Sequence, residues 1–227
     1  IMHWLIVAAV RAKTAEPSPL AVRYFAGMNQ QELRAFGSTL LDLWLREDTR
    51  TPSAEEAQAE ADALAVRYFQ WASNSPQNRY HGLTVEAIAA GLVGGIQNTI
   101  KGSATTSKGL LGVVAASAGP EVADRCSRYI RKHRGQRASQ AKILLQMLAW
   151  IDEPATVQLV MSIAARFRPK GIQAEAARQA ELLAERRGWT VDDLSDRSIP
   201  DAGFEANGRR VFDYGERTFT AHLGDDL

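Results

Sequence analysis

The fold is decided within residues 166–223, RFRPKGIQAEAARQAELLAERRGWTVDDLSDRSIPDAGFEANGRRVFDYGERTFTAHL, where helical spacing gives way to strand spacing. Residues 170–187 follow the pattern of an amphipathic helix, and Gly188 stands where a glycine commonly ends one. After a short acidic turn, apolar and polar side chains alternate, as in strands, over residues 209–214 and again at Phe219, Ala221 and Leu223. We therefore expect a helical protein that ends in a small β-hairpin.

Two turn signals frame these strands. Asn207-Gly208 is a hairpin-type turn before the first strand, and Gly215-Glu216 is expected to join the two strands as a two-residue turn. A lone hairpin is only marginally stable in water. Its apolar face is therefore expected to pack on the last helices or on a following domain.

Composition indicates an ordinary soluble protein. The 227 residues are 45% hydrophobic and 23% charged, enough to bury a sizeable core. The single Cys126 excludes an intrachain disulfide and a multi-cysteine metal site, which fits a reducing compartment, and we expect a cytoplasmic protein. The apolar opening Ile1–Val10 is too short to span a bilayer. We interpret it as part of a helix, in a fragment of a longer protein, and expect no membrane partner.

Helix start and stop signals recur along the chain. Ser53 and Glu56 have the spacing of a capping box and predict a helix over about 53–72. Gly119-Pro120 is expected to end one helix and open another, and Pro154 suits the first turn of a further helix. These signals predict an all-α architecture before the terminal strands.

The predicted helices fall into pairs. After a loop at 73–82, we expect pairs at 84–100 with 107–117, 121–134 with 136–151, and 154–166 with 170–187. Two echoes support repetition: LAVRYF occurs at 20–25 and 64–69, and Lys-Gly-Leu at 108–110 resembles Lys-Gly-Ile at 170–172. Because these spacings differ, we predict an irregular HEAT-like α-solenoid over residues 1–189. Residues 190–227 are expected to form a short helical turn and the β-hairpin, packed on the solenoid end.

A family resemblance rests on particular segments, best matched in the last sixty residues. They are Phe36-Gly37, Leu40-Leu41, Trp44-Leu45, residues 170–172 (KGI), 183–188 (LAERRG), 196–200 (DRSIP) and 213–219 (DYGERTF). In these the chain resembles the MolR-like family, large bacterial proteins of unknown function that often also carry a WGR domain. The resemblance implies a repeat scaffold without catalytic residues to carry over. The chain departs from the family at Glu216, where proline is usual, and over 73–107, which matches nothing in it.

Charge is distributed unevenly behind a formal net charge of +1. Residues 42–62 hold seven acidic side chains and two arginines, whereas residues 125–187 hold thirteen Lys or Arg and five Asp or Glu, a local net charge of +8. Clustered cations favour a polyanion as partner, although a solvated helix face is the alternative. The candidate nucleic-acid-binding residues are Arg125, Arg128, Arg131, Lys132, Arg134 and Arg137.

Other candidate sites favour structural roles. The glycines 91, 94 and 95 lack the Gly-Lys-Ser/Thr ending of a phosphate loop, so we expect them to permit close helix packing. The histidines at 3, 81, 133 and 222 lack the spacing of a metal site. Residues 79–81 (RYH) are interpreted as loop surface, although they are also a candidate ligand contact. Cys126 is expected to be a core residue, and the five tryptophans are expected to pack structurally.

Three functions remain open from the sequence. The leading hypothesis is a non-catalytic scaffold for a protein partner or for other domains of the parent chain, since no catalytic residues and no cofactor or metal site are expected. The alternative is nucleic-acid binding through phosphate contacts on the basic face. A remote alternative is a HEAT-like enzyme that excises alkylated bases, with Trp150 and Asp152 as its aromatic and acidic residues.

Overall fold

A computed structural model describes residues 2–197, 209–213, 215 and 217–222 of the protein. The chain divides into two compact units, Ile1–Ser117 (unit 1) and Ala118–Leu227 (unit 2). The elements of unit 1 are α1 (Met2–Arg11), α2 (Pro19–Phe25), α3 (Gln30–Asp48), α4 (Ala54–Ser73), α5 (Val85–Gln97), the 3₁₀ turn η1 (Thr105–Ser107) and α6 (Gly109–Ser117).

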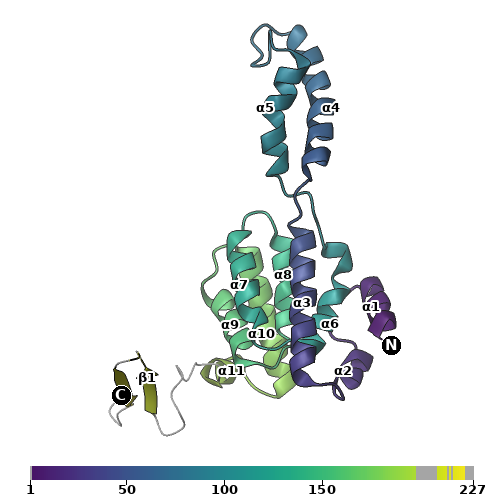
Figure 1. The fold of residues 1–227 in the computed structure, drawn as a ribbon. Helices are drawn as coiled ribbons and strands as arrows, with labels where there is room; N and C mark the ends of the chain where they lie inside the picture. Colours follow the sequence, from purple (N-terminus) through teal and green to yellow (C-terminus); the bar gives the residue numbers. More distant parts are fainter. Residues whose placement is uncertain (1, 198–208, 214, 216, 223–227) are drawn as a thin grey trace. The chain divides into compact units, whose positions relative to one another are not determined.

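The core of unit 1 forms where α1, α2 and α3 pack around α6 (Figure 1). Helix α6, GLLGVVAAS, is apolar around its whole circumference, and most of its side chains are buried. Such a helix needs partners on every side. Helix α3 supplies a buried stripe that includes Leu33, Leu41 and Trp44. The sequence signal for this core is therefore the uniform hydrophobicity of α6.

Helices α4 and α5 pack against each other as a helical hairpin (Figure 1). Helix α4 contributes a stripe of buried alanines at intervals of four residues, and α5 contributes the larger Ile88 and Ile96. The predicted capping box begins α4: the N–H of Glu56 donates to Ser53 Oγ at 3.1 Å, and the N–H of Ser53 donates to Glu56 Oε2 at 2.9 Å. The helix predicted over 53–72 is thus confirmed.

The base of this hairpin is closed by hydrogen bonds between its two ends. The backbone N–H groups of Lys101 and Gly102 both donate to the carbonyl oxygen of Arg50, each at 2.9 Å. A Cβ atom on Gly102 would lie 2.0 Å from the carbonyl oxygen of Glu47, so only glycine fits there without a backbone shift. The chain leaves α3 and returns toward α6 at nearly the same place.

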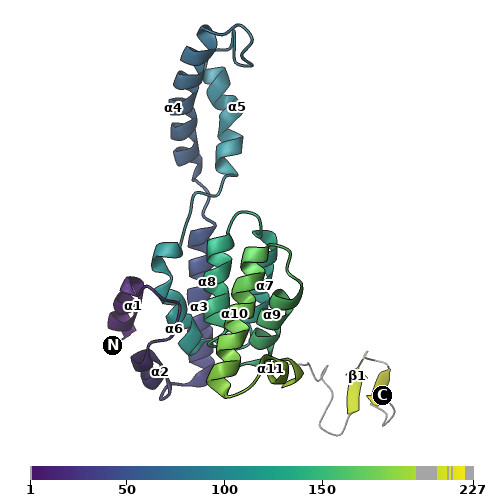
Figure 2. The same ribbon diagram turned by 180° about the vertical axis from the view of Figure 1, so that it is seen from behind.

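Unit 2 is a bundle of paired helices followed by a strand pair. Its elements are α7 (Val122–Lys132), α8 (Ala138–Leu148), α9 (Pro154–Arg166), α10 (Lys170–Arg187), α11 (Val191–Arg197), β1 (Arg209–Asp213) and β2 (Thr218–His222). Helices α7 to α10 lie side by side, with short connections between successive helices (Figure 2). Pro154 begins α9, and Gly188 ends α10 in the left-handed conformation with φ = 66°. Both sequence signals are confirmed.

Strands β1 and β2 are antiparallel, and Phe212 is opposite Phe219. The last pair of this ladder is Asp213 opposite Thr218. The two-residue turn predicted at Gly215-Glu216 includes Glu216, which lies outside the described residues. The N–H of Gly215 donates to Asp213 Oδ1 at 2.8 Å, and the φ of Gly215 is 79°. The sequence also assigned turn or strand positions to Asn207-Gly208, Tyr214 and Leu223, which lie outside the described residues.

The fold class is confirmed: the protein is all-α with a small C-terminal β-hairpin. Two details predicted within it are wrong. The predicted helix at 84–100 pairs with α4 and not with the helix at 107–117, which packs on α3. The glycines 91, 94 and 95 do not permit close packing, because a Cβ atom added at any of them would meet nothing within 4 Å. They face outward from α5.

Candidate nucleic-acid interface

The six basic residues predicted to bind nucleic acid do not share one environment. The apolar stripe of α7 is buried and includes Val122, Cys126 and Ile130. Arg125 lies beside this stripe and is half-buried, and so is Arg137. The exposed residues are Arg128, Arg131, Lys132 and Arg134.

Among these exposed residues, Arg128 already forms an ion pair. Its Nη2 lies 2.9 Å from Oδ2 of Asp124, one helical turn earlier. Arg131 donates from Nε to the Ser127 hydroxyl at 3.2 Å, which leaves its charge unmatched by that contact. Lys132 and Arg134 are exposed where α7 gives way to its connection with α8. The cations available to a partner therefore lie at the C-terminal end of α7.

The topology of unit 2 brings further cations to the same end. Successive helices in the bundle are joined by short connections, so the connections α7–α8 and α9–α10 lie at one end of the bundle. A Cβ atom on Gly171, at the start of α10, would lie 3.7 Å from Nζ of Lys142 on α8. We name the cationic residues of this region the basic end; they are Arg131, Lys132, Arg134, Arg137, Lys142, Arg166, Arg168 and Lys170.

The basic end contains no acidic residue in either of its chain segments. No Asp or Glu occurs in residues 131–142 or 163–174. Within the part of the chain that the structure describes, no ion pair is formed by Lys132, Arg134 or Arg168. Like charges that lie close together repel one another, and a polyanion relieves that repulsion. The arrangement suits a polyanionic partner.

The first carboxylate after the second of these segments, that of Glu175, already has hydrogen-bond partners. Burial raises the pKa of Glu175, but hydrogen bonds from Arg178, Gln179 and Gln146 outweigh burial and hold its pKa below the ordinary value. Arg178 Nη2 lies 2.6 Å from its Oε1. Glu175 is therefore ionised and already matched, so it does not neutralise the basic end.

Two helix N-termini also open at the basic end. Arg137 precedes α8 and Pro169 precedes α10, and neither N-cap side chain forms a capping hydrogen bond. The first backbone N–H groups of a helix carry a partial positive charge and bind phosphate oxygens. Cationic side chains beside two such termini add to one positive field. A structural alternative exists for Arg131 and Arg166, since cations near a helix C-terminus also offset the helix dipole.

At the opposite end of the bundle, two arginines interact with neighbouring residues of the bundle itself. Arg187 forms an ion pair with Asp152, and Arg186 lies 4.0 Å above the ring of Trp150 while it donates to the carbonyl of Ala149. Asp152 lines a small hollow of about 70 Å³ to which Trp150 does not contribute. The aromatic and acidic residues of the excision-enzyme alternative therefore do not form one pocket.

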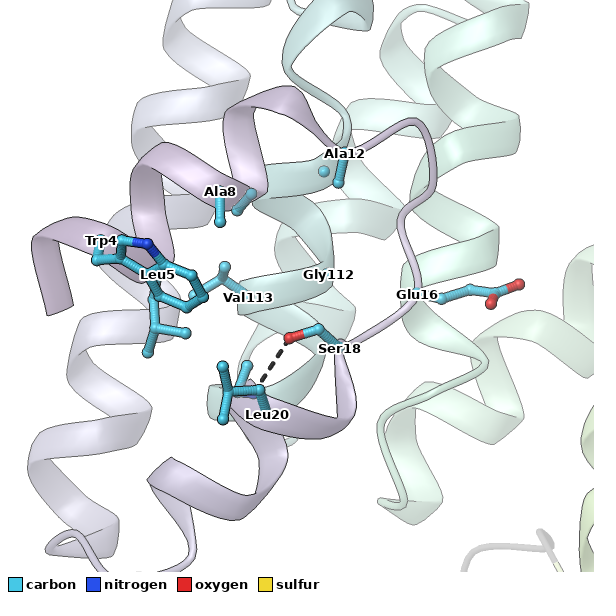
Figure 3. Close-up of a pocket in the computed structure, with 12 residues that line it drawn as sticks. Trp4, Leu5, Ala8, Ala12, Glu16, Ser18, Leu20, Gly112 and Val113 are labelled. Atoms are coloured by element: carbon cyan, nitrogen blue, oxygen red, sulfur yellow. Dashed lines mark hydrogen bonds between the residues drawn. The ribbon is translucent and has the colours of Figure 1, made fainter. Parts of the chain in front are cut away.

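A separate apolar hollow of about 220 Å³ lies between α1, α2 and α6 of unit 1. Figure 3 shows the side chains of Trp4, Leu5 and Leu20 around it and that of Glu16 directed away. Trp4 is 58% exposed and Trp71 is 63% exposed, so the prediction that every tryptophan packs structurally is wrong for these two residues. Val7 and Val10 on α1 and Val22 on α2 are also exposed.

The described residues contain no cluster of three or more His, Cys, Asp or Glu able to hold a metal ion. None of the described helices combines the length and the apolar character needed to cross a membrane.

The chain matches no known protein-family model and no solved structure. It is similar to a protein of Escherichia coli K12 named uncharacterized protein YehI, with 24% identity over 111 residues. The match covers 41% of this chain and spans 9% of the relative's length.

Proposed function

We propose that the chain is a nucleic-acid-binding helical module, which contacts backbone phosphates through the basic end of unit 2. The observation that carries this proposal is the gathering of eight Lys and Arg residues from two connections and the helix ends beside them, with no acidic residue in either chain segment. Phosphate contacts of this kind release counterions and give affinity without sequence preference. In this proposal the chain is a part of a larger MolR-like protein, and it does not act as an enzyme.

The experiment is fluorescence anisotropy with labelled duplex DNA across a series of salt concentrations. If about five phosphates are neutralised, the logarithm of the affinity falls against the logarithm of salt with a slope of about −4 to −5. The test variant is Arg134→Glu/Arg168→Glu, because these exposed residues lie on different connections. Arg128 is a poorer choice, because Asp124 already matches its charge.

The matched control is Arg23→Glu/Arg46→Glu, which makes the same change in net charge at exposed positions of unit 1. We expect the test variant to lose most of the affinity and the control to retain it. Absence of binding at about 50 mM salt, or an equal loss in both variants, overturns the proposal. Circular dichroism of each variant separates lost binding from lost folding.

The apolar surface of α1 and α2 favours a second role, as an interaction scaffold for another domain of the parent protein. Trp4 and Leu20, which both line the hollow between α1, α2 and α6, are each more than half exposed, as apolar side chains at an interaction site often are. Titration with the remainder of the parent protein is the test. Leu20→Glu is expected to abolish that association and Arg134→Glu/Arg168→Glu to leave it unchanged. No association, or one that Leu20→Glu does not weaken, overturns this role.

A further inference from the structure

The tip of the α4–α5 hairpin carries an ordered aromatic cluster. The rings of Tyr68 on α4 and Tyr80 in the connection stack with centroids 5.2 Å apart and an interplanar angle of 8°. The guanidinium of Arg79 lies 4.4 Å from the centroid of the Tyr80 ring. Trp71, one turn beyond Tyr68, is 63% exposed. We name Tyr68, Trp71, Arg79 and Tyr80 the aromatic tip.

The exposure of Trp71 follows from the way α4 packs. The face of α4 that meets α5 consists of Ala57, Ala61 and Ala65, with Ala72 buried at its end. Trp71 lies outside this stripe, so its ring cannot enter the seam between the two helices. Arg67, four residues earlier and also exposed, is on the same face of α4 as Trp71.

The connection that bears Arg79 and Tyr80 is held in one conformation. The N–H of Tyr80 donates to Asn78 Oδ1 at 3.0 Å, and the N–H of His81 donates to the Asn78 carbonyl at 2.9 Å. His81 Nδ1 lies 3.1 Å from the carbonyl oxygen of Ala72. A loop fixed in this way loses little conformational entropy when it binds a ligand.

A hollow of about 550 Å³ opens beside the cluster. It is lined by Tyr68, Trp71, Ser75, Gln77, Asn78, Arg79 and Tyr80. Among these lining residues, Arg79 is the one with a charged side chain. The hollow therefore combines exposed π faces, amide and hydroxyl groups and a positive charge, with Arg67 as a second cation nearby.

We propose that the aromatic tip binds single-stranded nucleic acid by stacking unpaired bases on Trp71. Base–aromatic stacking tolerates any sequence, because every base has a π face, and arginine adds both stacking and charge. The positive charge of Arg79 and Arg67 is complementary to the phosphates that accompany the bases. This charge favours nucleic acid over an uncharged proline-rich peptide, which also binds aromatic grooves. The inference concerns unit 1 and does not depend on the basic end of unit 2.

The test compares a labelled oligothymidylate of about twelve nucleotides with an abasic oligonucleotide of equal length and charge. Anisotropy is measured at about 1 M salt, where charges are screened beyond about 3 Å and stacking persists. We expect the oligothymidylate to bind and the abasic strand not to bind. Trp71→Ala should weaken binding by about 5- to 100-fold, whereas Trp71→Tyr should restore most of it.

Two controls separate this inference from the proposed function. Trp4→Ala removes another exposed tryptophan of unit 1 and should leave binding unchanged, as should Arg134→Glu/Arg168→Glu at high salt. Equal binding of the two strands, or no loss in Trp71→Ala, overturns the inference even if duplex DNA binds to the basic end. A proline-rich decapeptide that binds the tip while oligothymidylate does not also overturns it.

Discussion

Asp48 and Ala104 are joined by a hydrogen bond across 56 residues of chain: the backbone N–H of Ala104 donates to Asp48 Oδ1 at 2.9 Å. Asp48 ends α3, Ala104 precedes η1, and both residues are buried. The bond joins the two chain segments that enter and leave the α4–α5 hairpin.

The first prediction concerns this bond. Asp48→Ala leaves the buried N–H of Ala104 without its acceptor, which should lower the free energy of unfolding by about 1–3 kcal/mol. Asp48→Asn retains an acceptor oxygen and should lower the free energy of unfolding by a smaller amount. Urea denaturation followed by circular dichroism measures both variants, and equal losses would contradict this role of the carboxylate.

A second prediction contrasts two glycines of unit 1. Gly102→Ala forces a Cβ atom to within 2.0 Å of the Glu47 carbonyl oxygen and should destabilise the protein by about 3 kcal/mol. Gly94→Ala places a Cβ atom in open space on α5 and should stabilise it by about 0.5–1 kcal/mol. Thermal melts of the two variants should therefore shift in opposite directions. A stabilised Gly102→Ala variant would show that this close approach does not occur.

A third prediction concerns acid stability. The hydrogen bond from the Ser53 backbone lowers the pKa of Glu56 below its ordinary value of 4.5, and the charge of Arg50 lowers it further. A carboxyl whose pKa is depressed by folding stabilises the protein above its unfolded-state pKa, and this contribution is lost as the pH falls through the folded-state pKa. The free energy of unfolding of Glu56→Gln should therefore differ from that of the wild type near neutral pH, and the two values should converge in acid. Glu55→Gln, outside the capping box, is the control, and a constant difference at all pH values would contradict the mechanism.

A fourth prediction concerns Cys126, which is fully buried. Burial raises the pKa of its thiol, and the neighbouring Arg125 offsets this only in part. The thiolate is the reactive form, so the native protein should not react with a chromogenic disulfide reagent at pH 8. Reaction should begin only in denaturant, at the rate of unfolding. Rapid labelling of the native protein would refute the burial of this side chain.

The repeated hexapeptide LAVRYF shows how far local sequence determines structure. Both copies form helix, in α2 and α4, as their composition predicts. Yet Phe25 is 1% exposed whereas Phe69 is 41% exposed. Phe25 has the neighbouring core of unit 1 to enter, and Phe69 lies on a two-helix hairpin whose seam is filled by alanines. Burial depends on which helices become neighbours, and the hexapeptide does not encode that choice.

The candidate interface was predictable to a similar extent. The sequence revealed the basic run at 125–137, because its members are contiguous. Lys142, Arg166, Arg168 and Lys170 join the basic end only through the packing of successive helices. The helix pair predicted at 154–166 and 170–187 already implied the connection between α9 and α10, and this pairing was the signal from which these four cations could have been found. Arg125 could not be separated from its exposed neighbours, since its half-burial depends on the exact rotation of α7.

Because the base of the α4–α5 hairpin is closed, the chain leaves the core of unit 1 after residue 50 and re-enters it near residue 101. The carbonyl of Arg50 accepts from both Lys101 and Gly102, while α3 and α6 pack directly on each other. An arm attached at a single point can be lengthened, trimmed or exchanged without repacking α3 against α6. Such an arm is free to diverge faster than the body that bears it, and the same geometry makes it a natural unit to transplant onto another helical protein.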